Sequence, residues 1–157
     1  MDTPISTRLP GLALLCRARA RLCAVPIEHL AETMRPLPVA PFAGAPSFVC
    51  GLSLIRGTPT PVVDVGALLG DGEPPRAARF VSVRTGQRHV ALAVEGVLGI
   101  RELAAESLSE LPPLLGDVGR AAVAHIGALD AELLVVLEAA RLVPESLWRM
   151  LEGGDEE

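Results

Sequence analysis

The stretch GLSLIRGTPTPVVDV, residues 51–65, is the most informative part of this chain. Apolar and β-branched residues dominate on both sides of its centre, and this pattern predicts strands over residues 48–54 and 61–65. The residues RGTP at 56–59 contain the glycine and the proline that are typical of a tight connection. The stretch therefore predicts two strands joined by a short turn.

Three residues of this stretch suit particular backbone positions. Gly57 can adopt a positive φ or let another segment approach closely, because it has no Cβ. We expect Pro61 to end the loop before the second strand, and Asp64 to accept hydrogen bonds from backbone N–H groups where that strand ends.

Strand patterns continue on both sides of the stretch. Apolar and charged residues alternate in part over residues 12–25, which is typical of a half-exposed strand or hairpin. Residues 80–84 and 89–94 flank the sequence TGQ and predict a β-hairpin, and residues 97–100 can continue as a further strand. Several short strands with little helix indicate a β-barrel architecture.

Helical patterns are fewer. The positions of proline and of apolar residues predict short helices over residues 26–34, 103–111 and 144–151. Prolines throughout residues 35–47 predict an extended loop. Residues 133–137 fit either a buried strand or part of a helix, and local propensity favours the helix.

Length and composition favour one compact cytoplasmic domain. The chain has 157 residues, 50% of them hydrophobic, and it can bury one sizeable core of aliphatic side chains. No stretch approaches the roughly 20 apolar residues of a membrane span, and the apolar run at residues 12–15 is too short for a secretory signal. The three cysteines are odd in number and lack C-x-x-C spacing, which argues against disulfides.

The net charge of −5 comes mainly from the C-terminal end. Four of the nineteen acidic residues lie at positions 152–157, which leaves fifteen against fourteen arginines in the rest of the chain. A nearly neutral body offers no electrostatic footprint for nucleic acid. We expect residues 152–157 to form a disordered acidic tail.

Candidate catalytic and metal-binding side chains form no specific pattern. Cys50 lies in an apolar strand, where an inert thiol is expected. The histidines His29, His89 and His125 are scattered and lack the spacing of a metal site. We therefore predict no catalytic residue, no metal and no cofactor. A small hydrolase that uses Cys50 or paired carboxylates is the alternative from another functional class.

The order of motifs resembles the CheW family of chemotaxis adaptors over residues 12–151. CheW-type sequences carry a segment of the form G-V-x-N-L-R-G-x-x-x-P-V-V-D-L, which GLSLIRGTPTPVVDV matches. The segments AVPI at 24–27, ALAVEGVLGI at 91–100 and IGALD at 126–130 are similar to three further family motifs in the same order.

This resemblance implies an all-β fold of two small five-stranded SH3-like β-barrel lobes that share a hydrophobic core, with short helices including a C-terminal one. The CheW-like domain would span residues 8–151. Its lobes would lie at approximately 25–75 and 76–135, with the termini shared between them and the linker GDGEPP near their boundary. The resemblance also implies a strand at residues 133–137, against local propensity.

The resemblance further implies a non-enzymatic adaptor that couples a methyl-accepting chemoreceptor-type protein to a CheA-type histidine kinase. Such a protein would be cytoplasmic and recruited to receptor clusters, with no nucleic-acid partner and no direct membrane insertion. The expected partner-binding residues are Glu32, Arg56 and Gly57, whereas the motif residues expected to be structural are Gly51, Pro61 and Asp64.

Arg56 is the residue of greatest interest, because the matching family arginine is thought to pair with the glutamate that matches Glu32. A guanidinium held by a carboxylate is ordered and can offer its remaining donors to a partner. The alternative is that the pair only ties a helix to the barrel. Leu54 stands where the family has asparagine, which motivates a second alternative: a divergent adaptor that binds receptor but not kinase.

Overall fold

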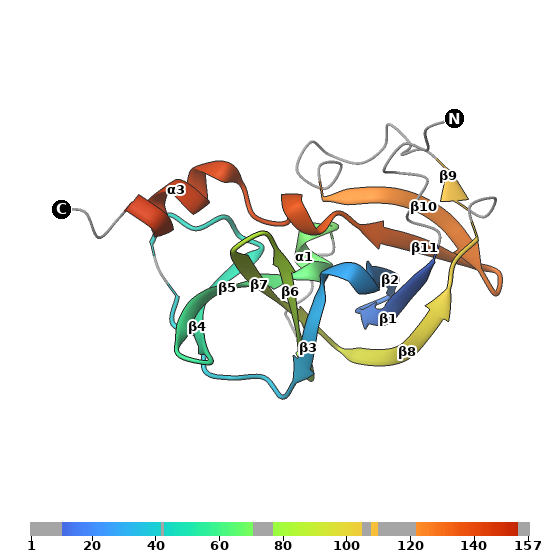
Figure 1. Cartoon of the computed structure of the whole chain (residues 1–157), viewed down its shortest axis with the longest axis horizontal. Coiled ribbons are helices and arrows are strands. Elements are labelled where there is room, and N and C mark those ends of the chain that lie inside the picture. The colour runs from blue at the N-terminus through green and yellow to red at the C-terminus, as the bar shows by residue number, and fades with distance from the viewer. Residues whose placement is uncertain (1–10, 42, 71–76, 105–107, 110–121, 154–157) are drawn as a thin grey trace.

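The computed structural model describes residues 11–41, 43–70, 77–104, 108–109 and 122–153. Most of these residues lie in short strands, so the fold is mainly β, as the resemblance implied (Figure 1). The described elements are, in chain order, β1 (Leu12–Ala18), β2 (Arg21–Pro26), η2 (Ile27–His29), β3 (Leu30–Met34), β4 (Val49–Ile55), β5 (Thr58–Asp64), α1 (Val65–Leu68), β6 (Arg79–Thr85), β7 (Arg88–Val94), β8 (Gly96–Glu102), β9 (Leu108–Ser109), β10 (Val123–Leu129), β11 (Glu132–Leu137), η4 (Ala139–Arg141) and α3 (Glu145–Gly153).

The strands form two sheets, which we call lobe 1 and lobe 2. Lobe 1, on the left in Figure 1, is five-stranded with the order β3-β6-β7-β5-β4. Lobe 2, on the right, has the order β8-β1-β2-β11-β10 with the two-residue β9 added at its edge. The two β lobes that the resemblance implied are thus present, and one of them carries a sixth short strand.

The lobes share one strand arrangement, but the chain enters it at different points. Among the described strands, each lobe has one parallel pair, β5 with β7 or β11 with β2, between antiparallel neighbours. Lobe 1 is continuous in sequence, whereas lobe 2 takes β1 and β2 from before lobe 1 and its other strands from after it.

The lobe boundary predicted at residues 75 and 76 is therefore wrong. Strands β6 and β7 belong to lobe 1, because residues 91–93 of β7 pair in parallel with residues 62–64 of β5. The chain passes into lobe 2 only between Val94 and Gly96. Residues 71–75 of the predicted linker lie outside the described residues.

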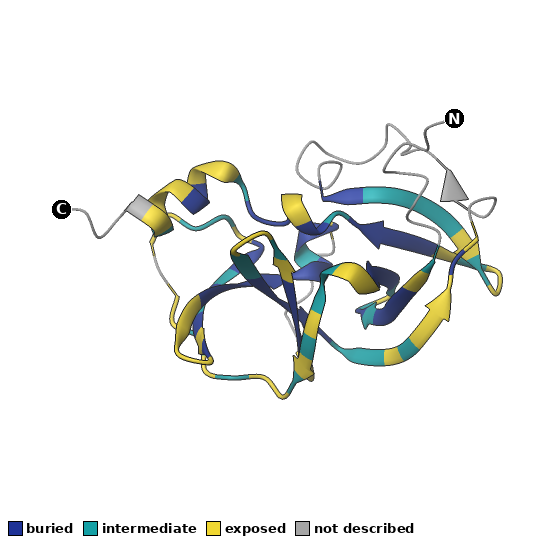
Figure 2. Cartoon of the chain, in the orientation of Figure 1, coloured by how far each residue is buried: buried dark blue, intermediate teal, exposed yellow. Residues whose placement is uncertain are grey.

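The largest hydrophobic core lies between the lobes. It combines side chains from the inner faces of both sheets with α1 and the C-terminal segment, including Val65, Leu92, Leu142 and Trp148. Two smaller clusters fill the individual lobes. Figure 2 shows the buried residues concentrated on the inner strands. Strands such as β1 are buried on both faces, which explains their nearly continuous apolar sequence.

The helix predicted over residues 26–34 is wrong. Ile27–His29 form one 3-10 turn, and Leu30–Met34 form β3, which pairs with β6. Burial in β3 alternates from residue to residue, as in a strand. Leu30 and Met34 are four residues apart, a spacing that suits a helix and a strand equally well, so pairing with β6 decides the outcome.

Other local predictions have mixed outcomes. Residues 108–109 of the predicted helix at 103–111 form β9, paired with β10, so that helix is wrong there; residues 105–107 and 110–111 lie outside the described part. The strand implied at residues 133–137 is confirmed as β11, and the C-terminal helix is confirmed as α3. Glu152, predicted in the acidic tail, belongs to α3.

Candidate functional site

The tip of the β4–β5 hairpin carries two of the predicted partner-binding residues. Arg56 and Gly57 form a two-residue turn between the paired residues Ile55 and Thr58. Their φ angles are +52° and +80°, and positive φ at both central positions is what a type I′ hairpin turn requires. Gly57 adopts this conformation without a Cβ clash, so the turn holds Arg56 at a fixed place on the surface.

Pro61 lies inside β5 and does not end a loop, because the strand already starts at Thr58. It is buried and pairs with Leu52 of β4. The parallel pairing of β5 with β7 begins only at Val62. Proline is tolerated at this position because this part of β5 has a paired neighbour on one side only.

Arg56 and Glu32 form a bidentate ion pair, as the resemblance implied. Arg56 Nε donates to Glu32 Oε2 at 2.7 Å, and Nη2 donates to Oε1 at 2.8 Å. These hydrogen bonds lower the pKa of the Glu32 carboxyl. Because β3 and β4 are the two edge strands of lobe 1, the pair bridges its open side. We call this pair the lobe 1 brace.

A cavity of about 290 Å³ lies beneath the lobe 1 brace. The hydroxyl-bearing residues Thr60 and Ser82 in its wall are almost fully buried. The Arg56 side chain, in contrast, is 77% exposed. The brace thus presents a guanidinium to solvent at the rim of a hollow. The cavity is lined by Ala31, Glu32, Ile55, Arg56, Thr58, Thr60, Ser82 and His89.

Gly51 has a packing reason for lacking a side chain. Its φ is +147°, and a Cβ there would lie 2.3 Å from the carbonyl oxygen of Ala40. The backbones of Ala40 and Leu52 exchange two hydrogen bonds, of 2.8 and 2.9 Å. Gly51 therefore lets the proline-rich loop before β4 lie directly against that strand.

Asp64 joins the two lobes. Its Oδ1 accepts from the Ala67 N–H at 3.4 Å, as expected for a carboxylate at a strand end that begins a helix. Its Oδ2 accepts from Nη2 of Arg19 at 2.6 Å. Arg19 belongs to the β1–β2 turn of lobe 2, so this ion pair crosses between the lobes.

Lobe 2 carries a second brace at the equivalent hairpin. Asp130 and Ala131 form the β10–β11 turn, also with positive φ, of +52° and +66°. Nη1 of Arg101, on the edge strand β8, lies 3.4 Å from Asp130 Oδ2. In this lobe 2 brace the turn supplies the carboxylate and the edge strand supplies the arginine. In the lobe 1 brace the turn supplies the arginine and the edge strand supplies the carboxylate.

Large apolar side chains are also exposed near these features. Leu54, two residues before Arg56, is 66% exposed. Other exposed side chains lie on η2 and β8, which begin where the chain passes from one lobe to the other. Exposed apolar side chains of this kind can supply the apolar part of a contact with another protein. They are Ile27, Leu98 and Ile100, with Leu12 on β1.

The alternative catalytic residues do not form a site among the described residues. Burial raises the pKa of the Cys50 thiol, which disfavours the nucleophilic thiolate. Within the described ranges, no group of three or more His, Cys, Asp and Glu side chains could hold a metal ion. None of the described helices is long and apolar enough to cross a membrane.

Sequence reasoning did not predict the ion pairs of Arg19 with Asp64, of Arg88 with Glu145 and Glu152, or of Arg101 with Asp130. The alternation around Arg19 predicted only a half-exposed strand, whereas its guanidinium is buried against Asp64. The available signals were an arginine within a predicted strand or hairpin and a motif aspartate far along the chain, and no local pattern relates them.

Comparison with known proteins identifies similar chains. A sequence model of the CheW-like domain family matches residues 12–146. The chain is 36% identical over 105 residues to protein FrzA of Myxococcus xanthus, covering 65% of this chain and 62% of FrzA. It is 26% identical over 109 residues to the chemotaxis protein CheW of Rhizobium meliloti, covering 68% and 70% of the two chains.

A solved structure has the same fold. The scaffolding protein TtCheW from Thermoanaerobacter tengcongensis superposes with a TM-score of 0.71 at 20% sequence identity. The match covers 82% of this chain and 89% of that one. The chain matches 62% of the length of FrzA, which is less than two thirds of that protein.

Proposed function

Because this chain belongs to the CheW-like domain family, we propose that it is a non-enzymatic cytoplasmic adaptor in a chemosensory pathway. In this role it couples a methyl-accepting chemoreceptor-type protein, at a receptor cluster, to a CheA-type histidine kinase. The observation that carries the proposal is the lobe 1 brace, which holds an exposed arginine in a fixed orientation.

The chemistry of the brace suits recognition of a partner. Glu32 engages Nε and Nη2 of Arg56, so Nη1 can donate to an acceptor on another protein. The I′ turn and the bidentate contact restrict the guanidinium before binding, which lowers the entropy lost when a partner docks. Glu32, Arg56 and Gly57 therefore act together in this proposal, with Gly57 supplying the turn.

The exposed apolar side chains suit the rest of the interface. We propose that the receptor's hairpin tip docks where the lobes meet, near Ile27 and Leu98. Lobe 1 docks against the regulatory domain of the kinase. Such contacts combine an apolar centre with a polar rim, and Arg56 supplies part of that rim.

Leu54 bears on the kinase contact. It is 66% exposed, and its paired neighbour Pro59 is exposed too. This apolar pair favours a protein contact but differs from the polar asparagine of the family. The divergent adaptor, which binds receptor and not kinase, is thus the second candidate. Co-precipitation of the purified chain with the kinase regulatory domain at micromolar concentration would contradict it.

The receptor contact is tested by Arg56→Ala, measured by titration calorimetry with a cytoplasmic receptor fragment. We expect receptor affinity to fall about tenfold or more, as for a central interface arginine, with the melting temperature nearly unchanged. Arg101→Ala is the matched control, because it removes the arginine of the lobe 2 brace and leaves lobe 1 intact. Equal effects of both variants, or unfolding of Arg56→Ala alone, would contradict a recognition role for Arg56.

The enzymatic alternative is tested separately. Cys50→Ala should leave binding to receptor and kinase fragments unchanged, because the thiol is half-buried in lobe 1 and its pKa is raised. Loss of a hydrolytic activity on a small ester in this variant would support the alternative.

A further inference from the structure

The interaction between Arg19 and Asp64 is the most buried ion pair among the described residues. Only 7% of the Arg19 side chain and 10% of the Asp64 side chain are exposed. Arg19 sits at the β1–β2 turn of lobe 2 with a φ of +56°. Asp64 ends β5 and begins α1 in lobe 1. A side chain from one lobe thus reaches a carboxylate inside the other.

Lobe 1 leaves space for the guanidinium at Gly66. A Cβ on Gly66 would lie 2.2 Å from Nη1 of Arg19 and 2.8 Å from its Cζ. Gly66 is buried in α1 between Val65 and Ala67, and any larger residue would displace the arginine. Arg19, Asp64 and Gly66 therefore form one unit, which we call the Arg19 clamp.

The Arg19 clamp adds direction to a contact that is otherwise apolar. The shared core between the lobes is aliphatic apart from a few residues, and apolar burial is non-directional. A 2.6 Å charge-assisted hydrogen bond depends on both distance and angle. Next to it, the Glu95 N–H donates to the carbonyl of Arg17 at 2.8 Å, where the chain passes from lobe 1 to lobe 2.

We propose that Arg19, Asp64 and Gly66 are positioning residues that fix the angle between the two lobes and thereby shape the partner-binding surface at their junction. The second half of this inference rests on the proposed adaptor function. Ile27 lies on η2, between β2 of lobe 2 and β3 of lobe 1, and Leu98 lies on β8 just after the chain has left lobe 1. The distance between Arg56, at the β4–β5 turn of lobe 1, and Leu98, on β8 of lobe 2, depends on how the lobes are set against each other.

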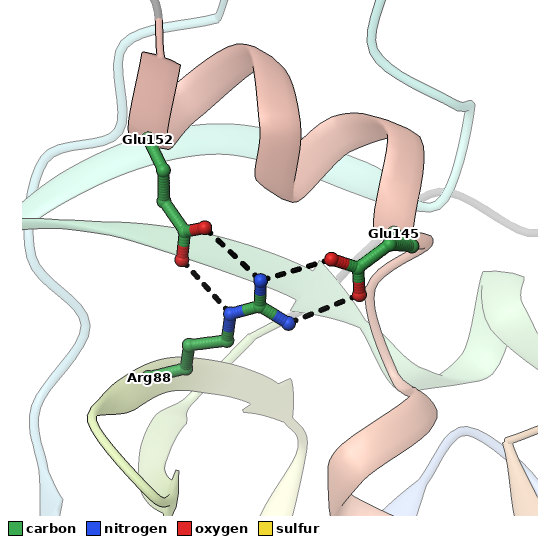
Figure 3. Close-up of polar contacts among 3 residues, drawn as sticks. All are labelled: Arg88, Glu145 and Glu152. Carbon is green, nitrogen blue, oxygen red and sulfur yellow. Dashed lines mark hydrogen bonds and ion pairs between the residues drawn. The ribbon is translucent and has the colours of Figure 1, made fainter.

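A second arginine provides an internal comparison. Arg88, at the start of β7 in lobe 1, holds α3, the helix that follows lobe 2 (Figure 3). Its Nε donates to Glu152 Oε2 at 2.8 Å, and its Nη1 donates to Glu145 Oε1 at 3.1 Å. We call these three residues the Arg88 clamp. Its glutamates are half or more exposed, so water and salt screen it.

The lobe angle is measured directly by pulsed electron paramagnetic resonance. Spin labels are attached to cysteines introduced at exposed sites on lobe 1 (Arg84→Cys) and lobe 2 (Ala128→Cys) of a chain in which Cys50 is serine. Arg19→Gln and Asp64→Asn should each broaden or shift the interlobe distance distribution, because each leaves one buried charge without its counter-charge. The double variant Arg19→Gln/Asp64→Asn, which is neutral, should recover most of the original distribution. Arg88→Gln should leave it unchanged.

Gly66→Ala tests the same unit without removing a charge. Alanine favours a helix more than glycine does, so α1 itself should be stabilised, yet the added methyl group pushes the guanidinium away from Asp64. We expect a folded protein with a shifted interlobe distance. An unchanged distance in Gly66→Ala overturns the inference, even where the charge variants fail to fold.

The effect on partners is measured with the same receptor fragment and with the kinase regulatory domain. Variants that shift the interlobe distance should bind the receptor fragment about tenfold more weakly, and the neutral double variant should recover binding. Normal binding by a variant with a clearly shifted distance overturns the positioning role. If the unsubstituted chain binds neither fragment, the proposed function fails, and the lobe-angle inference is then decided by the distances alone.

Discussion

The Arg19 clamp and the Arg88 clamp perform similar connections in very different surroundings. In each, an arginine at or beside a hairpin turn of one lobe reaches a carboxylate of a helix outside that lobe: Asp64 at the start of α1, or Glu145 and Glu152 on α3. The Arg88 clamp has two glutamates and four hydrogen bonds. The Arg19 clamp has one aspartate, yet it is almost fully buried. The Arg88 clamp therefore has more hydrogen bonds, whereas the Arg19 clamp is more deeply buried.

Burial should decide which clamp matters more. Breaking an exposed ion pair lowers the free energy of unfolding only slightly, because water replaces each partner. A buried pair that loses one member leaves a charge without water or counter-charge, which is far more costly. The Arg88 clamp is also supported by Trp148, which is buried in the shared core and whose ring centroid lies 4.9 Å from the guanidinium carbon of Arg88. Apolar contact can hold α3 even when the ions separate.

The largest expected effect is that of Asp64→Ala. This change leaves the Arg19 guanidinium buried without its carboxylate and removes the acceptor at the start of α1, so we expect the free energy of unfolding to fall by about 3 to 5 kcal/mol. Urea titration followed by circular dichroism measures this. Glu145→Ala is the matched control in the Arg88 clamp and should change the unfolding midpoint much less. A comparable shift in both would show that burial does not separate the clamps.

The overall fold could be predicted from sequence, because it depends on patterns that are local or that recur in the family. The β4–β5 hairpin follows from apolar runs around Arg56 and Gly57, and the strand β11 followed from the resemblance alone, against its helical propensity. The lobe boundary could not be predicted. It depends on parallel pairing between β5 and β7, which are separated in the chain by α1, the predicted linker and β6 and carry no sequence signal for their register.

The candidate site was predictable to the extent that the family motif contains it. Arg56 and Glu32 were paired by resemblance, and the structure supplies the two hydrogen bonds between them. The contact of Arg19 with Asp64 was not predictable, because the residues are 45 positions apart and meet only after the lobes have packed. A charged residue in an alternating segment is normally on the exposed face of a strand. The buried exception needs the tertiary structure.

A smaller effect is expected for Trp148→Ala, which tests whether apolar contact or the ion pairs hold α3. Trp148 is 7% exposed and lies on the terminal helix, so we expect a loss of about 3 kcal/mol, at the low end for a buried tryptophan. Hydrogen exchange should show faster exchange over α3 than over β5. Trp148→Phe, which keeps an aromatic ring, is the control. If Arg88→Gln speeds hydrogen exchange over α3 as much as Trp148→Ala does, the ion pairs and not the apolar contact hold α3 in place.

The smallest expected effect is the response of each clamp to pH and salt, which should differ between the exposed Arg88 clamp and the buried Arg19 clamp. Hydrogen bonds from Arg88 lower the pKa of Glu145 and of Glu152 below the ordinary value of 4.5. A carboxyl whose pKa is lowered by folding stabilises the folded state above its unfolded pKa, and this contribution is lost as the pH falls through the folded pKa. The ion pairs that hold α3 against Arg88 should therefore weaken only below about pH 4.5.

Trp148 is the only tryptophan in the chain and reports on this weakening through its fluorescence. Below pH 4.5 its emission should shift modestly to the red, and salt at about 1 M, where the screening length is roughly 3 Å, should produce part of that shift at neutral pH. Arg88→Gln should remove both responses, because neither glutamate then has its guanidinium. The interlobe distance set by the buried Arg19 clamp should stay constant in high salt. If the interlobe distance depends on salt while the Trp148 fluorescence does not, the Arg19 clamp and not the Arg88 clamp is the one that salt screens, which contradicts this prediction.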